Sequence, residues 1–167
     1  MRGVDAADRV GRGGGERVSA TVSVLPTARG LVLDIFVPGR AAPQGSKSPR
    51  GRTATGRVIL VESSKAVKPW RSDVGWHAAK AYSGPPLSGA VRVDLEFVMP
   101  RPAGTPKRRA TPAAIKRPDL DKLTRAIFDA LSAVIWRDDS QVIEMVVRKR
   151  IAEIDETPGC RIQVGET

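Results

Sequence analysis

Four aspartates flank one short apolar segment of this 167-residue chain, and they are the residues best suited to chemistry. Asp119 and Asp121 precede the segment, and Asp138 and Asp139 follow it. Carboxylates that converge repel one another, and a divalent cation relieves that repulsion. Hard oxygen ligands favour Mg²⁺ or Mn²⁺, and such an ion can bind a phosphate oxygen and help to generate hydroxide. The pattern therefore indicates metal-dependent phosphodiester hydrolysis.

Each of these aspartates also has an ordinary structural interpretation. Asp119 could cap a following helix, and Asp121 could stabilise the first turn of that helix. The run from Asp138 to Ser140 is typical of a turn. An Asp-x-Asp pair alone is a weak indication of a metal site. Two pairs of aspartates that flank a single helix are a stronger indication. A returning strand could bring the two ends of that helix together, although the sequence does not require it.

The chain is strongly basic, with 28 Lys and Arg against 18 Asp and Glu and a formal net charge of +10. A charge of this size attracts polyanions and predicts salt-sensitive binding. The single His77 and the single Cys160 exclude a disulfide framework and a His- or Cys-based zinc site within one chain. Any catalytic metal should therefore sit on oxygen ligands. The candidates for DNA contacts are basic residues in and beside two Gly/Pro-rich stretches: Lys47, Arg50, Arg52, Arg108, Arg109, Lys116, Arg117 and Lys122.

The apolar pattern predicts a single α+β domain with a mixed β-sheet packed against helices. We expect strands over 31–37, 58–61, 91–99 and 141–149, helices over 64–82 and 120–134, and basic loops over 40–57 and 100–118. Residues 1–28 are predicted to form a flexible basic, Gly-rich arm, 29–155 the nuclease domain and 156–167 a C-terminal tail. The sequence has neither an apolar run of membrane-spanning length nor a secretory signal, which favours the cytoplasm.

From Arg117 onward the sequence resembles the RusA family of Holliday junction resolvases. The likeness rests on Arg117-Pro118-Asp119-Leu120-Asp121, then Asp129-Ala130-Leu131, then Asp138-Asp139-Ser140-Gln141-Val142, and it spans about 31–149. The resemblance implies a RusA-like fold in which Asp119, Asp121 and Asp139 bind the metal, with Asp138 an adjacent candidate. It also implies a Mg²⁺-dependent homodimer that binds four-way DNA junctions and cuts them by paired symmetric incisions. Such enzymes act in DNA recombination and repair, and many are encoded by phages or prophages.

Two positions depart from the family pattern. The family commonly has Asn directly after the second aspartate, where this chain has Lys122. The family's catalytic Lys, four residues after that aspartate, is Arg125 here. Arginine can hold a phosphate but does not readily give up a proton. Either Arg125 has a purely electrostatic role in catalysis, with Lys122 compensating, or this member is impaired.

Three functions are compatible with these residues. The first is the metal-dependent resolvase. The second is an impaired or non-catalytic DNA-binding protein on the same scaffold, and the third is an RNA-binding or ribosome-associated protein. Aromatic residues make up only 4% of the chain, which argues against recognition of single strands by stacking. Because a chain with one carboxylate cluster must make two incisions, we expect a homodimer, with the end of the strand at Phe97–Met99 or the turn at Trp136 as candidate interfaces.

Overall fold

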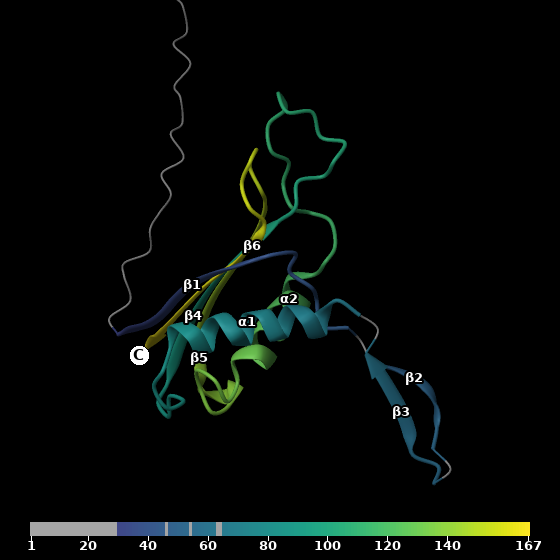
Figure 1. Ribbon diagram of the computed structural model, residues 1–167, viewed down its shortest axis with the longest axis vertical. Helices are drawn as coiled ribbons and strands as arrows, with labels where there is room; N and C mark the ends of the chain where they lie inside the picture. Colours follow the sequence, from purple (N-terminus) through teal and green to yellow (C-terminus); the bar gives the residue numbers. More distant parts are fainter. Residues whose placement is uncertain (1–29, 46, 54, 63–64) are drawn as a thin grey trace, which may run out of the picture.

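A mixed sheet and two helices form the body of the computed structural model, which describes residues 30–45, 47–53, 55–62 and 65–167 (Figure 1). The predicted arm over 1–28 lies outside these residues. The elements follow one another as β1 (Leu31–Pro38), β2 (Lys47–Arg52), β3 (Val58–Glu62), α1 (Val67–Ala81), β4 (Val91–Met99), α2 (Leu120–Leu131), the 3₁₀ turn η1 (Asp139–Gln141), β5 (Val142–Ile151) and β6 (Gly159–Glu166).

The main sheet has four strands in the order β1-β6-β4-β5. Strand β6 runs antiparallel to both of its neighbours, whereas β4 and β5 run parallel. Parallel strands need a long crossover connection, and here the connection contains the basic loop and α2. The predicted α+β fold with a mixed sheet is therefore confirmed.

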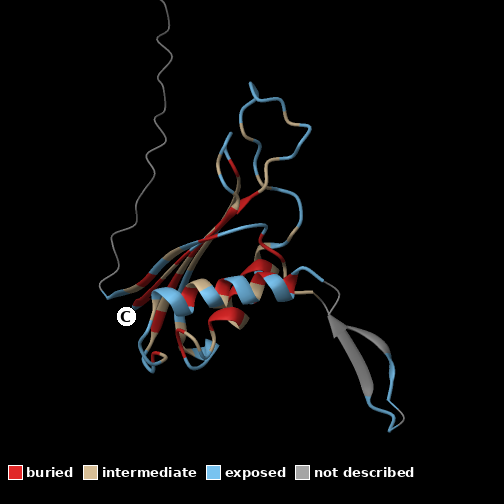
Figure 2. Ribbon diagram, viewed as in Figure 1, coloured by how far each residue is buried: buried red, intermediate tan, exposed pale blue. Residues whose placement is uncertain are grey.

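The core lies between one face of this sheet and the two helices (Figure 2). Strand β4 follows the predicted alternation, because Val91, Val93, Leu95 and Phe97 are fully buried and the charged residues between them are not. From α2, Leu123 and Ile127 are fully buried against them. Burying a side chain of this size contributes about 1.5–3 kcal/mol each, so the amphipathic pattern fixes which face of α2 points inward.

The prediction of a C-terminal tail over 156–167 is wrong. Those residues contain β6, which lies between β1 and β4 and buries Cys160, Ile162 and Val164. The apolar alternation of β6 is short, but pairing on both edges stabilises the strand. A Cβ added at Gly159 would lie 2.4 Å from the Val37 carbonyl oxygen, so the strand begins where only glycine fits.

The basic segment 40–57 is not a continuous loop as predicted, because β2 pairs antiparallel with β3 in a separate two-stranded sheet. Backbone pairing and the turn form this hairpin, whereas the sequence of β2 has no apolar alternation that would predict a strand. The helix expected over 120–134 ends earlier, at Leu131. Ala133, which has a φ of 65°, lies outside the helical conformation.

Both candidate interfaces are occupied by the chain's own core. Phe97 and Trp136 are fully buried, and Met99 is 7% exposed. The large apolar side chains exposed on β5 are instead Ile143, at 64%, and Met145, at 49%. Strand β5 is an edge of the main sheet, so these residues lie beside backbone groups that have no strand neighbour on that side among the residues that the structure describes.

Candidate functional site

Asp119 and Asp121 lie at the start of α2 with exposed side chains. Asp119 occupies the N-cap position but makes no capping hydrogen bond from its side chain. Its carboxylate instead lies 3.1 Å from the Lys122 Nζ. The hydrogen bond from Lys122 lowers the pKa of Asp119, with further electrostatic effects of Lys122, Arg117 and Lys149. A carboxylate surrounded by cations is held in its charged form, as a metal ligand must be.

Lys149 positions the segment that delivers these aspartates, a role that the sequence analysis did not identify. Its Nζ donates to the Pro118 carbonyl oxygen at 2.8 Å and to the Lys116 carbonyl oxygen at 3.0 Å. The partly buried Lys149 sits on β5 and pairs with Phe97 of β4 in the parallel register. The only sequence signal for this role is that Lys149 lies on the same face of the strand as Val147 and Ile151, which pack against the core.

Asp138 and Asp139 lie at the other end of α2. Asp138 forms a capping box on η1 with Gln141, whose Oε1 accepts from the Asp138 N–H at 2.9 Å. Hydrogen bonds with the Ser140 side chain and with the Ser140 backbone N–H, at 2.9 Å, lower the pKa of Asp138. Asp139 Oδ1 accepts from the indole N–H of buried Trp136 at 3.0 Å and from the Ser132 hydroxyl. The turn interpretation therefore describes Asp138 well, whereas the carboxylate of Asp139 is oriented by the core.

The expectation that the two aspartate pairs meet within one chain is not met. A helix of 12 residues rises about 18 Å, so residues just before it and just after it lie at opposite ends. The crossover places Asp119 near the end of β5, beside Lys149, and Asp139 just before its start. Among the described residues no group of three or more His, Cys, Asp or Glu could hold a metal ion.

Arg125 lies one helical turn after Asp121 with an exposed side chain. Residues four apart share a helix face, so the guanidinium can reach an anion bound near Asp121. Asp129, in the middle of the family-like motif, lies instead 3.3 Å from Arg71 of α1. That part of the motif joins the two helices.

The predicted DNA-contacting residues of the long connection are exposed. Arg101 braces this loop, because its guanidinium donates to the carbonyl oxygen of Arg109 at 2.8 Å and to the Thr111 hydroxyl at 2.6 Å. The brace orders the part of the loop that contains Arg109, whereas Lys116 and Arg117 directly precede Pro118 and the start of α2 in the sequence. The exposed residues are Arg108, Arg109, Lys116 and Arg117. Of the three predicted contacts in β2, Arg52 is exposed, whereas the side chains of Lys47 and Arg50 lie outside the described set.

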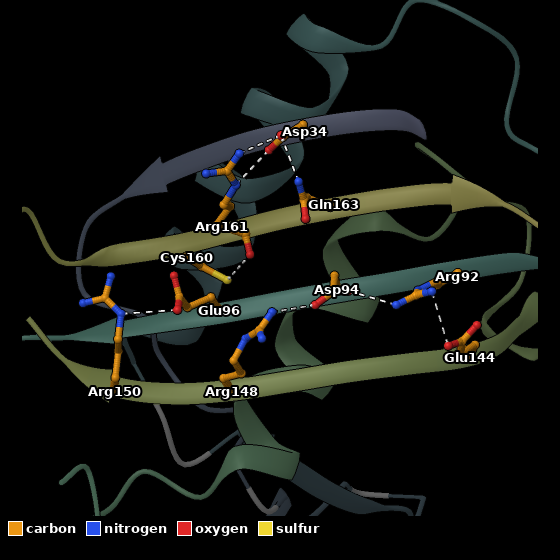
Figure 3. A network of polar contacts seen from close by, with 10 residues as sticks. All are labelled: Asp34, Arg92, Asp94, Glu96, Glu144, Arg148, Arg150, Cys160, Arg161 and Gln163. Atoms are coloured by element: carbon orange, nitrogen blue, oxygen red, sulfur yellow. Dashed lines mark hydrogen bonds and ion pairs between the residues drawn. The ribbon is translucent and has the colours of Figure 1, made fainter. Parts of the chain in front are cut away.

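The outer face of the sheet is also rich in arginine, but its charges are paired (Figure 3). Arg161 donates to Asp34, Arg148 lies 3.1 Å from Asp94, and Arg150 lies 3.3 Å from Glu96. These pairs neutralise the face internally. Exposed cations that could bind a polyanion therefore lie away from this face, on the long connection (Arg108, Arg109, Lys116 and Arg117), on α2 (Arg125), on α1 (Lys68 and Lys80) and on the hairpin (Arg52 and Arg57).

Comparisons with known proteins agree with this architecture. The family model described as Endodeoxyribonuclease RusA matches residues 40–165. The chain is also similar to the Uncharacterized protein YqaN of Bacillus subtilis (strain 168), with 28% identity over 129 residues, 72% of this chain and 89% of YqaN. No helix within the described ranges is long and apolar enough to cross a membrane. The family match covers most of the fold and both aspartate pairs, and the chain therefore belongs to the RusA family of endodeoxyribonucleases.

Proposed function

We propose that this chain is a Mg²⁺-dependent endonuclease that resolves four-way DNA junctions by paired, symmetric phosphodiester hydrolysis. The supporting observation is the pair of exposed carboxylates, Asp119 and Asp121, at the start of α2 among Lys122, Arg117 and Lys149. Carboxylates surrounded by cations suit a site where a metal ion and a phosphate meet. Family membership supports the same reaction class.

The donor set fits magnesium better than zinc. Mg²⁺ is usually held by one or two carboxylates and keeps several waters, whereas zinc prefers Cys and His ligands. Asp119 and Asp121 would hold the ion, since neither carboxylate is used as a helix cap. A bound Mg²⁺ would supply a Lewis acid for the phosphate and a more acidic water.

The chain's own residues would orient the DNA around that ion. Arg125 would bind a phosphate oxygen from one turn along α2, because its planar guanidinium fork matches phosphate geometry. Lys149 would keep Asp119 in place through its hydrogen bond to the Pro118 carbonyl. The basic surface on the braced loop would hold the neighbouring phosphates.

We also propose that the active form is a homodimer in which Asp139 of the partner subunit completes each carboxylate set. Two antiparallel copies of α2 place the start of one helix beside the end of the other. The free edge of β5, with exposed Ile143 and Met145, is a surface on which such a pair could form. This arrangement gives two equivalent sites, as paired incisions require.

An impaired DNA-binding protein is the second candidate. It is favoured by Lys122, whose ammonium group lies against the Asp119 carboxylate, and by arginine at position 125. On this hypothesis the lysine replaces the cation, and junction binding persists without cleavage.

Incubation with a synthetic four-way junction, with Mg²⁺ or with EDTA, separates the two candidates. The resolvase should make symmetric cuts that EDTA abolishes, and Asp121→Asn should bind the junction with unchanged affinity but not cut it. Binding without any cut in Mg²⁺ or Mn²⁺ would leave only the second candidate. Cutting that persists in EDTA would contradict the metal site.

A further inference from the structure

The β2–β3 hairpin is a basic ribbon that stands away from the sheet and from both helices (Figure 1). Its strands pair with each other and join no strand of the main sheet. Over residues 47–62 the sequence has four cationic residues, Lys47, Arg50, Arg52 and Arg57, against one acidic residue, Glu62. Ordering such a segment costs conformational entropy, and its charge suits a polyanionic partner.

The turn of this hairpin is held by its own hydrogen bonds. The Gly56 N–H donates to the Thr53 carbonyl oxygen at 2.9 Å, and the Arg57 N–H donates to the Thr53 hydroxyl at 3.1 Å. The hydroxyls of Thr53 and Thr55 lie 2.8 Å apart. Gly56 has a φ of +80°, which glycine adopts without steric penalty. The arginines on either side of the turn, Arg52 and Arg57, are therefore presented in a defined place.

Arg52 and Arg57 lie together at this end of the ribbon. Arg52 pairs with Val58 in the strand register, and Arg57 directly precedes Val58. Both residues are exposed, and neither forms an ion pair with another residue in the described parts of the chain. The arginines on the outer face of the main sheet differ, because each has a carboxylate partner.

The dimensions of the ribbon suit the major groove of B-DNA. Paired strands lie about 4.8 Å apart, and a strand of six residues extends roughly 20 Å. The major groove is about 12 Å wide and about 8.5 Å deep, and it admits a two-stranded β-ribbon. An arginine there can donate to both O6 and N7 of guanine.

We infer that the β2–β3 hairpin is a DNA-binding arm that enters the major groove of a duplex arm of the branched substrate. Arg52 and Arg57 contact guanine edges there, away from the carboxylates on α2. This arm would add a base preference to an enzyme that otherwise binds by shape and charge. The branched nature of the substrate rests on the proposed function, whereas the contact between the hairpin and the major groove does not.

Methylation protection tests the arm on a junction with guanines in each duplex arm, and on a linear duplex. Dimethyl sulfate methylates guanine N7 in the major groove and adenine N3 in the minor groove. The full chain should protect guanine N7 in a duplex arm. R52A/R57A should lose that protection, and its affinity should fall about thirtyfold, the low end for two bidentate contacts.

Two matched variants and a melting curve accompany this test. K68A/K80A removes the same charge from exposed positions on α1 and should keep the guanine protection. R52K/R57K keeps the charge but loses the planar fork, so it should retain the salt dependence and lose most of the protection. Unchanged melting temperatures would show that each variant is folded.

Three results would contradict the inference that the hairpin is a DNA-binding arm. One is a guanine pattern that is the same in the wild type and in R52A/R57A. Another is protection of adenine N3 alone, which would place the hairpin in the minor groove. The third is a change in the sedimentation mass of free R52A/R57A, which would make the hairpin a contact between protein chains. Failure to cut a junction would refute the proposed function instead, because guanine protection can be measured without cleavage.

Discussion

Complementation between two inactive variants tests whether each active site is built from two chains. Asp121→Asn removes a carboxylate at the start of α2, and Asp139→Asn removes one at the end of the same helix. Each variant alone should fail to cut a four-way junction, because every site in the proposed homodimer would lack a ligand. Mixing the two after subunit exchange should restore activity if Asp139 acts on the partner's site.

The size of the effect follows from the length of α2. Its 12 residues separate the two positions by about 18 Å, whereas Mg²⁺ binds oxygen at about 2.1 Å, so one ion cannot join both carboxylates of one chain. With equal mixing about half of the dimers are mixed, and each mixed dimer has one intact site and one doubly altered site. The mixture should therefore contain about a quarter of the wild-type number of sites.

Strand-resolved gels of a junction labelled on each strand distinguish a single nick from paired cuts in opposing strands. A mixed dimer should nick one strand and leave the opposing strand intact, since it has a single working site. Each variant mixed with itself is the matched control and should stay inactive. An inactive mixture in which mixed dimers are demonstrated by native mass spectrometry would refute the shared site, because each chain would then have to supply its own ligands.

Three further predictions concern charge. Arg125→Ala should lower the cleavage rate at least tenfold while Arg125→Lys keeps or raises it, and normal single-turnover cutting by the alanine variant would make Arg125 a surface residue. Hydrogen bonds with Arg150 lower the pKa of Glu156 to about 2. The contribution of this ion pair to the free energy of unfolding should therefore be present above pH 4.5 and be lost as the pH falls toward 2. Glu156→Gln should remove about 1–2 kcal/mol of stability at pH 7 in urea titrations, and an unchanged midpoint would contradict this. Four loop residues changed together to alanine, Arg108, Arg109, Lys116 and Arg117, should flatten the slope of log binding constant against log salt concentration by about three to four. An unchanged slope would place the DNA path away from these residues.

The elements that sequence could predict are those with strong apolar periodicity. Strand β4 alternates over nine residues, and α2 has an apolar stripe with charged residues on its other face, so burial alone determines how each packs. Strand β6 alternates over only Cys160, Ile162 and Val164, and its stability comes from partners on both sides, β1 and β4, that lie far earlier in the chain. Strand β2 has no apolar alternation, which is why 40–57 was predicted to be a loop, whereas the apolar run of β3 was predicted as a strand and is one.

The aspartates could be found from the sequence, but their arrangement could not. Residue types and spacing identify Asp119, Asp121, Asp138 and Asp139, whereas the crossover between parallel strands decides which of them are neighbours. The helix length already implies the separation, because a strand that follows a helix in a crossover begins at the far end of that helix. Lys149 was missed because its role depends on carbonyl groups of a loop more than thirty residues earlier.

The central place of β6 has a consequence for biosynthesis. Strand β1 emerges from the ribosome well over a hundred residues before β6, which pairs with it from Pro38 opposite Gly159 to Leu31 opposite Gly165. At about 5–20 residues per second, β1 waits on the order of ten seconds for that neighbour. During this interval β1 and β4 have unpaired edges to which chaperones or other nascent chains can bind. Substitutions in β6 should thus reduce the yield of native protein in cells before they affect any step on DNA.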